Sequence, residues 1–121
     1  MSNSSKSDMK NYQEIVVRIS THLATLRKDR PDLMDGFSQL SGAATKEGVL
    51  SAKTKEMIAM ALGVAARCDG CIGFHAKALV KLGTTKQELE EILGMAIYMG
   101  GGPSLMYAAD ALMAFEQFGG K

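Results

Sequence analysis

The stretch KEMIAMALGVAARCDGCIGFHAKAL, residues 55–79, decides the fold and also contains most of the reactive side chains. Its first half holds an apolar run that is too short to cross a bilayer, which takes about 20 residues. With Ser51 as its cap, this run predicts a helix over residues 52–66 that is buried on most sides. A break near residue 67 separates it from a helix that begins near Cys68 and ends at Gly83, a glycine suited to the position after a helix.

Working outward, four more helices are expected. Apolar residues recur at three- and four-residue steps over 9–28, which is typical of an amphipathic helix. Pro31 suits the first turn of the next helix, and residues 41–50 loosen into a connection. Thr85 with Glu88 forms a capping-box pattern for a helix that runs to about residue 99. GGGP at 100–103 is a break before a last helix over 104–118. No segment shows strand alternation, so the sequence predicts an all-α, single-domain protein of six helices.

Composition sets the remaining limits. The chain has 121 residues, 46% of them apolar, which fits one folded domain over residues 9–121. Residues 1–8 are polar and are expected to be a disordered tail. The 14 basic and 13 acidic residues leave a net charge of +1. This balance argues against nucleic acid or an anionic membrane as a partner. Without a hydrophobic leader in its first ten residues, the protein is expected to be soluble and cytoplasmic.

The two cysteines and one histidine form the candidate site. If Cys68, Cys71 and His75 lie on one helix, steps of about 100° place all three on one stripe. A thiolate is favoured at a helix N-terminus, and a histidine can take the thiol proton. The CxxC spacing lets the second sulfur close a disulfide on the first. Glu56, twelve residues before Cys68, reaches this group if the chain folds back near residues 66 and 67.

These residues resemble a known signature. Glu56, then Cys68-x-x-Cys71, then three residues and His75, is similar to the motif of the alkylhydroperoxidase D-like proteins of the carboxymuconolactone decarboxylase superfamily. The resemblance covers about residues 30–118. It implies an all-helical fold packed in homo-oligomers, commonly trimers or hexamers. It also implies peroxidase or peroxiredoxin-type oxidoreductase activity, an antioxidant role that depends on a redox-active disulfide.

The resemblance assigns roles as well. Cys71 would attack the oxidant and Cys68 would resolve it, with Glu56 and His75 as a proton relay. The expected partners are a hydroperoxide or disulfide substrate and a thiol reductant, with no metal and no organic cofactor. One position departs from the pattern, because Gly70 stands where well-studied members have a histidine. This departure favours thiol–disulfide chemistry over robust peroxidase turnover.

Several alternatives stay open at this stage. The cysteines could be two buried core thiols, or they could bind a metal ion with His75 and a fourth ligand. A helical assembly module and a decarboxylase-like enzyme acting on a small acid are further readings. Since Cys71 is four residues before His75, it has the nearer base, and it is the expected nucleophile on that ground too. His22 is expected to be structural or solvated. Helices that are apolar nearly all round predict burial against another subunit.

Overall fold

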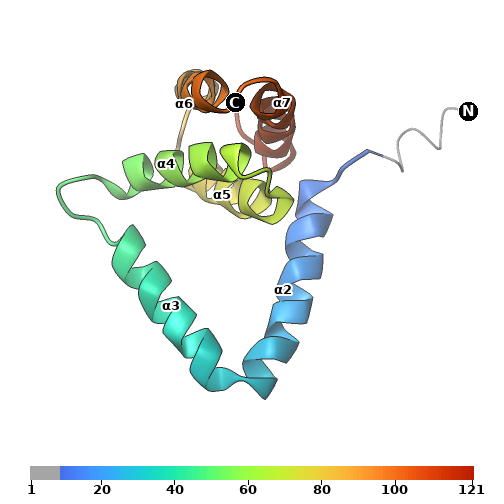
Figure 1. The fold of residues 1–121 in the computed structure, drawn as a ribbon, viewed down its shortest axis with the longest axis vertical. Helices are drawn as coiled ribbons and strands as arrows, with labels where there is room; N and C mark the ends of the chain where they lie inside the picture. Colours follow the sequence, from blue (N-terminus) through green and yellow to red (C-terminus); the bar gives the residue numbers. More distant parts are fainter. Residues whose placement is uncertain (1–8) are drawn as a thin grey trace, which may run out of the picture.

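The computed structural model describes residues 9–121, which form six helices and no strand (Figure 1). The expected tail at 1–8 lies outside the described residues. The helices follow one another through short connections, and the all-α prediction is confirmed. Their bounds are α2 (Tyr12–Asp29), α3 (Pro31–Thr45), α4 (Ala52–Ala65), α5 (Asp69–Lys81), α6 (Lys86–Gly100) and α7 (Gly102–Gln117).

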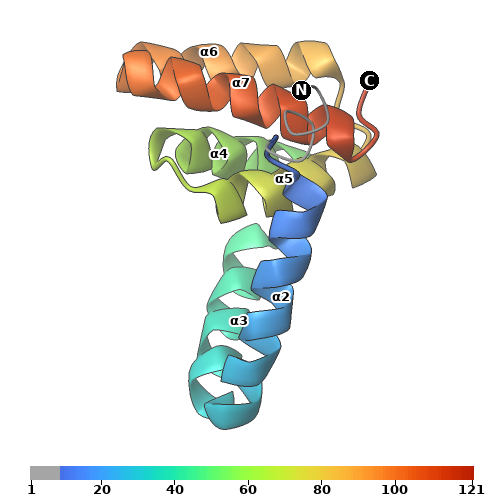
Figure 2. The ribbon, with the colours of Figure 1, turned by 90° about the vertical axis from the view of Figure 1, so that its right-hand side faces the viewer.

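The helices are arranged as a two-layered body with a projecting arm. The pair α6 and α7 lies across the pair α4 and α5, and the hairpin of α2 and α3 extends away from both pairs (Figure 2). Only the start of α2 packs into the body, against α5 and α7. In Figure 1 the arm and α4 outline a triangle, and the cysteine-bearing start of α5 lies near the corner where α2 enters the body.

The predicted helix ends are largely confirmed by their caps. The Ser51 side chain accepts a hydrogen bond from Thr54 N, and Thr85 with Glu88 forms a complete capping box. Pro31 occupies the first turn of α3, where its missing N–H has no consequence. Gly83 follows α5 with a φ of 76°, a left-handed conformation that glycine adopts without a side-chain clash. Side-chain and backbone caps therefore fix these boundaries.

Three expectations about the helices were wrong. Residues 41–45 continue α3 as helix, so the connection is confined to residues 46–51. Gly101 alone separates α6 from α7, and Pro103 sits in the first turn of α7. In the single chain, α4 is not buried on most sides: Ile58 is 45% and Leu62 65% exposed. One face of α4 packs against α5, α6 and α7, and α3 makes a smaller contact with α4.

The core lies where α4, α5, α6 and α7 meet, with the first turns of α2 added from one side. Leu79 and Phe115 are both fully buried there. The arm contributes little to this core, because α3 has no buried residue and α2 buries only Tyr12 and Val16. The full set of buried apolar residues in the core is Tyr12, Met60, Val64, Ile72, Ala76, Leu79, Leu89, Leu93, Ala96, Ala108, Ala111, Ala114 and Phe115.

Across residues 9–121, no helix combines the length and the apolar character that crossing a bilayer requires.

Candidate functional site

The turn between α4 and α5 positions the cysteines. Arg67 adopts a left-handed φ of 57°, and its N–H donates to Val64 O at 3.0 Å. Cys68 N donates to Gly63 O, also at 3.0 Å. These two bonds form a Schellman motif, which ends α4 and turns the chain sharply. The reversal brings α5 back along α4, as the Glu56 contact required.

Cys68 is the N-cap of α5 and not one of its helical residues. Its Sγ accepts a hydrogen bond from Cys71 N at 3.2 Å. The three residues were expected on one stripe of a helix. In the structure only Cys71 and His75 are helical, and Cys68 precedes the helix. A cap sulfur that faces the free N–H groups of a helix is well placed to carry negative charge. Both cysteines are free thiols and both are partly exposed.

Cys71 lies in a different environment from its neighbour. The pKa of its thiol is raised to about 11. Burial is the largest cause, and the hydrogen bond with Cys68 and the charge of Cys68 also contribute. The backbone approaches closely here, because Gly63 of α4 faces the Cys71 side chain. A methyl group added at Gly63 would lie 2.9 Å from the Cys71 Cβ. Glycine at 63 thus permits the close helix contact that shields Cys71.

Glu56 and His75 come together as the sequence predicted. The distance between His75 Nδ1 and Glu56 Oε2 is 2.6 Å, with the side chains 28% and 16% exposed. When Glu56 is ionised it accepts the bond, so Nδ1 donates and Nε2 is the free nitrogen of a neutral ring. Within the described residues, no hydrogen bond joins His75 to either sulfur. The pair can hold and pass a proton, and its orientation is fixed by the short bond.

The thiols open onto an apolar pocket of about 520 Å³. It lies in the angle between the arm and the start of α5, so α2 and α3 supply one wall. The lining includes both cysteines and His75 but no lysine, arginine or acidic residue of the described chain. Its residues are Ile19, Leu23, Phe37, Ser41, Cys68, Gly70, Cys71, Phe74 and His75. The shape and chemistry suit a small apolar molecule.

Gly70, the position that departs from the resemblance, faces this pocket wall. A methyl group at Gly70 would lie 2.8 Å from Cδ1 of Ile19 on α2. A histidine here would therefore require Ile19 to move. The arm occupies the space that the absent histidine would need.

A polar cluster next to the cysteines was not predicted. Asp69, the residue after Cys68, accepts hydrogen bonds from Lys10 Nζ at 3.1 Å and from the hydroxyl of Tyr12 at 2.8 Å. Lys10 Nζ also contacts Asp110 of α7 at 2.8 Å. The lysine is 59 and 100 residues from these partners in the chain, so spacing gave no signal of the cluster.

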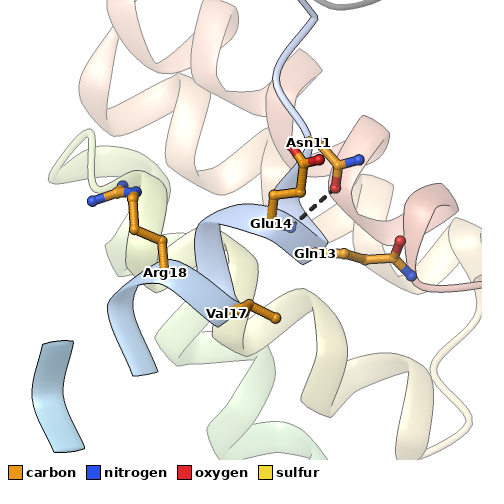
Figure 3. Close-up of a pocket in the computed structure, with 5 residues that line it drawn as sticks. All are labelled: Asn11, Gln13, Glu14, Val17 and Arg18. Carbon is orange, nitrogen blue, oxygen red and sulfur yellow. Dashed lines mark hydrogen bonds between the residues drawn. The ribbon is translucent and has the colours of Figure 1, made fainter. Parts of the chain in front are cut away.

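Other candidate groups lie away from the thiols. His22 is exposed on α2, as expected for a solvated residue. A separate open hollow of about 460 Å³ is lined by the N-cap Asn11 and by residues of the first half of α2, and Figure 3 draws these side chains. Asn11 caps that helix by accepting from Glu14 N at 3.1 Å. The hollow is lined by one helix end only, and no pair of reactive groups faces it.

The metal alternative has no support in the geometry. Among residues 9–121, no three or more histidine, cysteine, aspartate or glutamate side chains are grouped so that they could hold a metal ion. Glu56 is engaged by His75 and does not complete a site with the sulfurs.

Comparisons with known proteins show which sequences and folds this chain is similar to. Residues 31–114 match the sequence profile of the carboxymuconolactone decarboxylase family. A crystal structure of an apo protein of that family from Legionella pneumophila is 62% identical, with a TM-score of 0.89 over 91% of this chain and 98% of that one. A Thermotoga maritima structure is 27% identical, with a TM-score of 0.76 over 86% and 92%.

Two further proteins are similar to this chain in sequence. An uncharacterized protein of Cupriavidus necator is 39% identical over 101 residues, which is 84% of this chain and 89% of that protein. An uncharacterized protein from the cox locus of Paracoccus denitrificans is 30% identical over 86 residues, 71% of this chain and 78% of that protein. The similarity therefore extends over most of the chain and beyond the cysteine motif.

Proposed function

Because the chain belongs to the carboxymuconolactone decarboxylase family, we propose that it is a thiol–disulfide oxidoreductase that reduces small apolar hydroperoxides through Cys68 and Cys71. One observation carries the proposal: two free thiols at the start of α5 share an apolar pocket with a histidine that a glutamate orients. The reducing cytoplasm is the compartment in which such a pair is kept as a dithiol.

We assign the thiolate of the reduced protein to Cys68. Its sulfur accepts the Cys71 amide at the helix start, whereas burial raises the pKa of Cys71 to about 11. The resemblance gives the attacking role to Cys71, and that assignment stays a prediction. The geometry of the reduced site favours Cys68, because its sulfur faces an N–H group at the helix start that would stabilise an anion, and the stabilised anion is the better nucleophile.

The reaction balances with the two thiols alone. The thiolate attacks the terminal oxygen of the hydroperoxide, so an S–O bond forms and the O–O bond breaks. The leaving alkoxide takes up the proton that the Cys68 thiol released, which His75 can carry, and becomes an alcohol. The second thiol then attacks the sulfenic acid, forms the Cys68–Cys71 disulfide and releases water. The pair has lost two electrons, and an external dithiol must reduce it by thiol–disulfide exchange.

The pocket argues against a decarboxylase-like reaction. An acid substrate gains from a permanently charged cationic group, and the lining holds no lysine or arginine among the described residues. A hydroperoxide with a hydrocarbon group gains from the leucine and phenylalanine walls instead. The apolar lining therefore supports the oxidoreductase over an enzyme acting on a small acid.

We further propose that copies of the chain cover one another's arm. Leu33, Phe37 and Leu40 of α3 are 52%, 63% and 65% exposed in the single chain. The exposed surface is 7898 Å², against about 6,300 Å² for a typical folded monomer of this mass. A standard interface takes about 800 Å² from each partner. The excess is thus large enough for assembly, and the resemblance suggests a trimer or hexamer.

Hydroperoxide consumption tests the proposed function. With tert-butyl hydroperoxide and dithiothreitol, the native protein should consume peroxide, and Cys68→Ser and Cys71→Ser should each abolish turnover. Glu56→Gln and His75→Ala should lower turnover by about 10²–10⁴-fold, the usual contribution of general acid–base catalysis. His22→Ala is the matched control, because His22 is exposed on the arm. Turnover that survives both serine variants would contradict the proposal.

A further inference from the structure

The turn that carries the cysteines is held by side chains that the proposed reaction does not use. Lys10 Nζ bridges Asp69 Oδ1 and Asp110 Oδ2 at 3.1 and 2.8 Å. The hydroxyl of the fully buried Tyr12 donates to the same Asp69 oxygen at 2.8 Å. Asp69 lies directly after Cys68 and is the first residue of α5. Residues 10 and 12 thus contact the cysteine-bearing turn between α4 and α5 through the Asp69 carboxylate.

The position of Lys10 does not depend on its ion pairs alone. Gln117 Nε2 donates to the backbone carbonyl of Lys10 at 2.8 Å, and Gln117 Oε1 accepts from Tyr12 N at 2.7 Å. The ammonium also lies 5.1 Å from the centre of the Tyr107 ring, within cation–π range. An isolated exposed ion pair orders a lysine only weakly. Here Gln117 of α7 binds the backbone on both sides of residue 11, so the Lys10 ammonium is held beside Asp69.

Lys10 offsets the negative charge that Asp69 places next to Cys68. Asp69 adjoins Cys68, and a negative charge close to a thiol disfavours its ionisation. Hydrogen bonds from Lys10 to Asp110 and to Asp69 raise the pKa of the lysine despite its partial burial, so it stays charged. Burial, with the bond to Asp69, raises the pKa of Tyr12, which keeps its hydroxyl a donor. The positive charge beside Asp69 therefore persists throughout the neutral range.

We propose that Lys10 is a positioning residue for the cysteine pair: it neutralises Asp69 and fixes the first turn of α5, so that the thiolate forms at Cys68. The inference rests on the proposed function, in which that thiolate begins the reaction. Tyr12 shares the mechanical part of this role because it binds the same oxygen, but it supplies no charge. Lys10 is thus the residue whose loss should change reactivity and its pH dependence together.

Other ionisable groups border the turn, and the variants must leave them unchanged. Arg67 precedes Cys68 and adds a second positive charge, while Glu56 and His75 are engaged with each other. The groups on the surrounding elements are Lys10 from the segment before α2, Tyr12 from α2, Glu56 from α4, Arg67 from the turn, Asp69, Cys71 and His75 from α5, and Asp110 from α7. Substituting Lys10 alone therefore isolates its charge.

The test measures alkylation of Cys68 by iodoacetamide in full-length chains that also carry Cys71→Ser. Lys10→Met should slow the reaction about three- to tenfold at pH 7 and should slow it less at pH 10, because a positive charge that favours thiolate formation matters less as the pH rises. Lys10→Arg should keep the native rate. Adding Asp69→Asn to Lys10→Met should restore it, because the unpaired charge is gone. Lys28→Met, on the exposed side of α2, is the control with the same change in charge.

Two results would overturn the proposal. One is equal rates at pH 7 for Lys10→Met and Lys28→Met. The other is a slowing that is the same at pH 7 and pH 10, or that Asp69→Asn fails to reverse, because lost packing and not lost charge would then be the cause. Alkylation needs neither peroxide nor reductant. A native protein without turnover would therefore refute the proposed function and leave this result standing.

Discussion

Replacing each cysteine in turn separates the reactivities of the two sulfurs. The pKa of Cys71 is raised from 9.0 to about 11. At pH 7 a thiol of pKa 9.0 is about 1% ionised, whereas one of pKa 11 is about 0.01% ionised, a hundredfold difference. In Cys68→Ser the contributions of Cys68 disappear, but burial, the largest cause, stays. Cys71 should therefore still react more slowly than an ordinary thiol, by up to about a hundredfold.

Iodoacetamide alkylation followed by intact-protein mass spectrometry measures both rates. In Cys71→Ser, Cys68 keeps the amide bond from residue 71, because serine retains the backbone N–H, and it should alkylate faster than Cys71 does in Cys68→Ser. Rates for the same variants unfolded in urea supply the control, since both sulfurs should then react alike. If Cys71 in Cys68→Ser alkylates at pH 7 as fast as Cys68 in Cys71→Ser, the assignment of the thiolate to Cys68 is refuted.

Three further outcomes are expected. Gly63→Ala should cost about 1–3 kcal/mol in the free energy of unfolding, because its methyl group meets Cys71 Cβ at 2.9 Å, whereas Gly94→Ala, with nothing within 4 Å, should not destabilise; equal denaturation midpoints would contradict this. The raised pKa of Cys71 means that this thiol keeps its proton to a higher pH in the folded reduced protein than in the unfolded chain. Stability should therefore fall between about pH 9 and 11, and less so in Cys71→Ala, as denaturant titrations would show. Phe37→Asp should dissociate the assembly in sedimentation, and a native protein that already sediments as a monomer would refute the proposed interface.

Local chemistry made much of the fold predictable. Ser51, Thr85 with Glu88, and Gly83 mark helix ends by bonds to neighbouring residues, so their spacing sufficed. Residues 41–45 were misjudged because small residues such as Gly42 weaken helix propensity, yet α3 continues through them. A propensity is only a weak guide where the preceding turns already extend the helix.

The candidate site was predictable only in part. Glu56 and His75 meet because one sharp turn reverses the chain, and the motif indicated both residues. The contact of Lys10 with Asp110 joins residues 100 apart and leaves no pattern in the sequence. The shielding of Cys71 depends on Gly63 of a neighbouring helix, which only the packing reveals. Local spacing thus indicated the reactive groups, whereas the environment that distinguishes the two sulfurs comes from tertiary contacts.

Formation of an intramolecular disulfide tests the central claim most directly. The fully reduced native protein is treated with one equivalent of tert-butyl hydroperoxide, and its free thiols and intact mass are measured before and after reduction with dithiothreitol. The account predicts that both thiols disappear together, with a mass loss of two hydrogens and a Cys68–Cys71 linkage in the peptide map, and that dithiothreitol restores both. Two thiols that stay free under these conditions, with the hydroperoxide unconsumed, would contradict it.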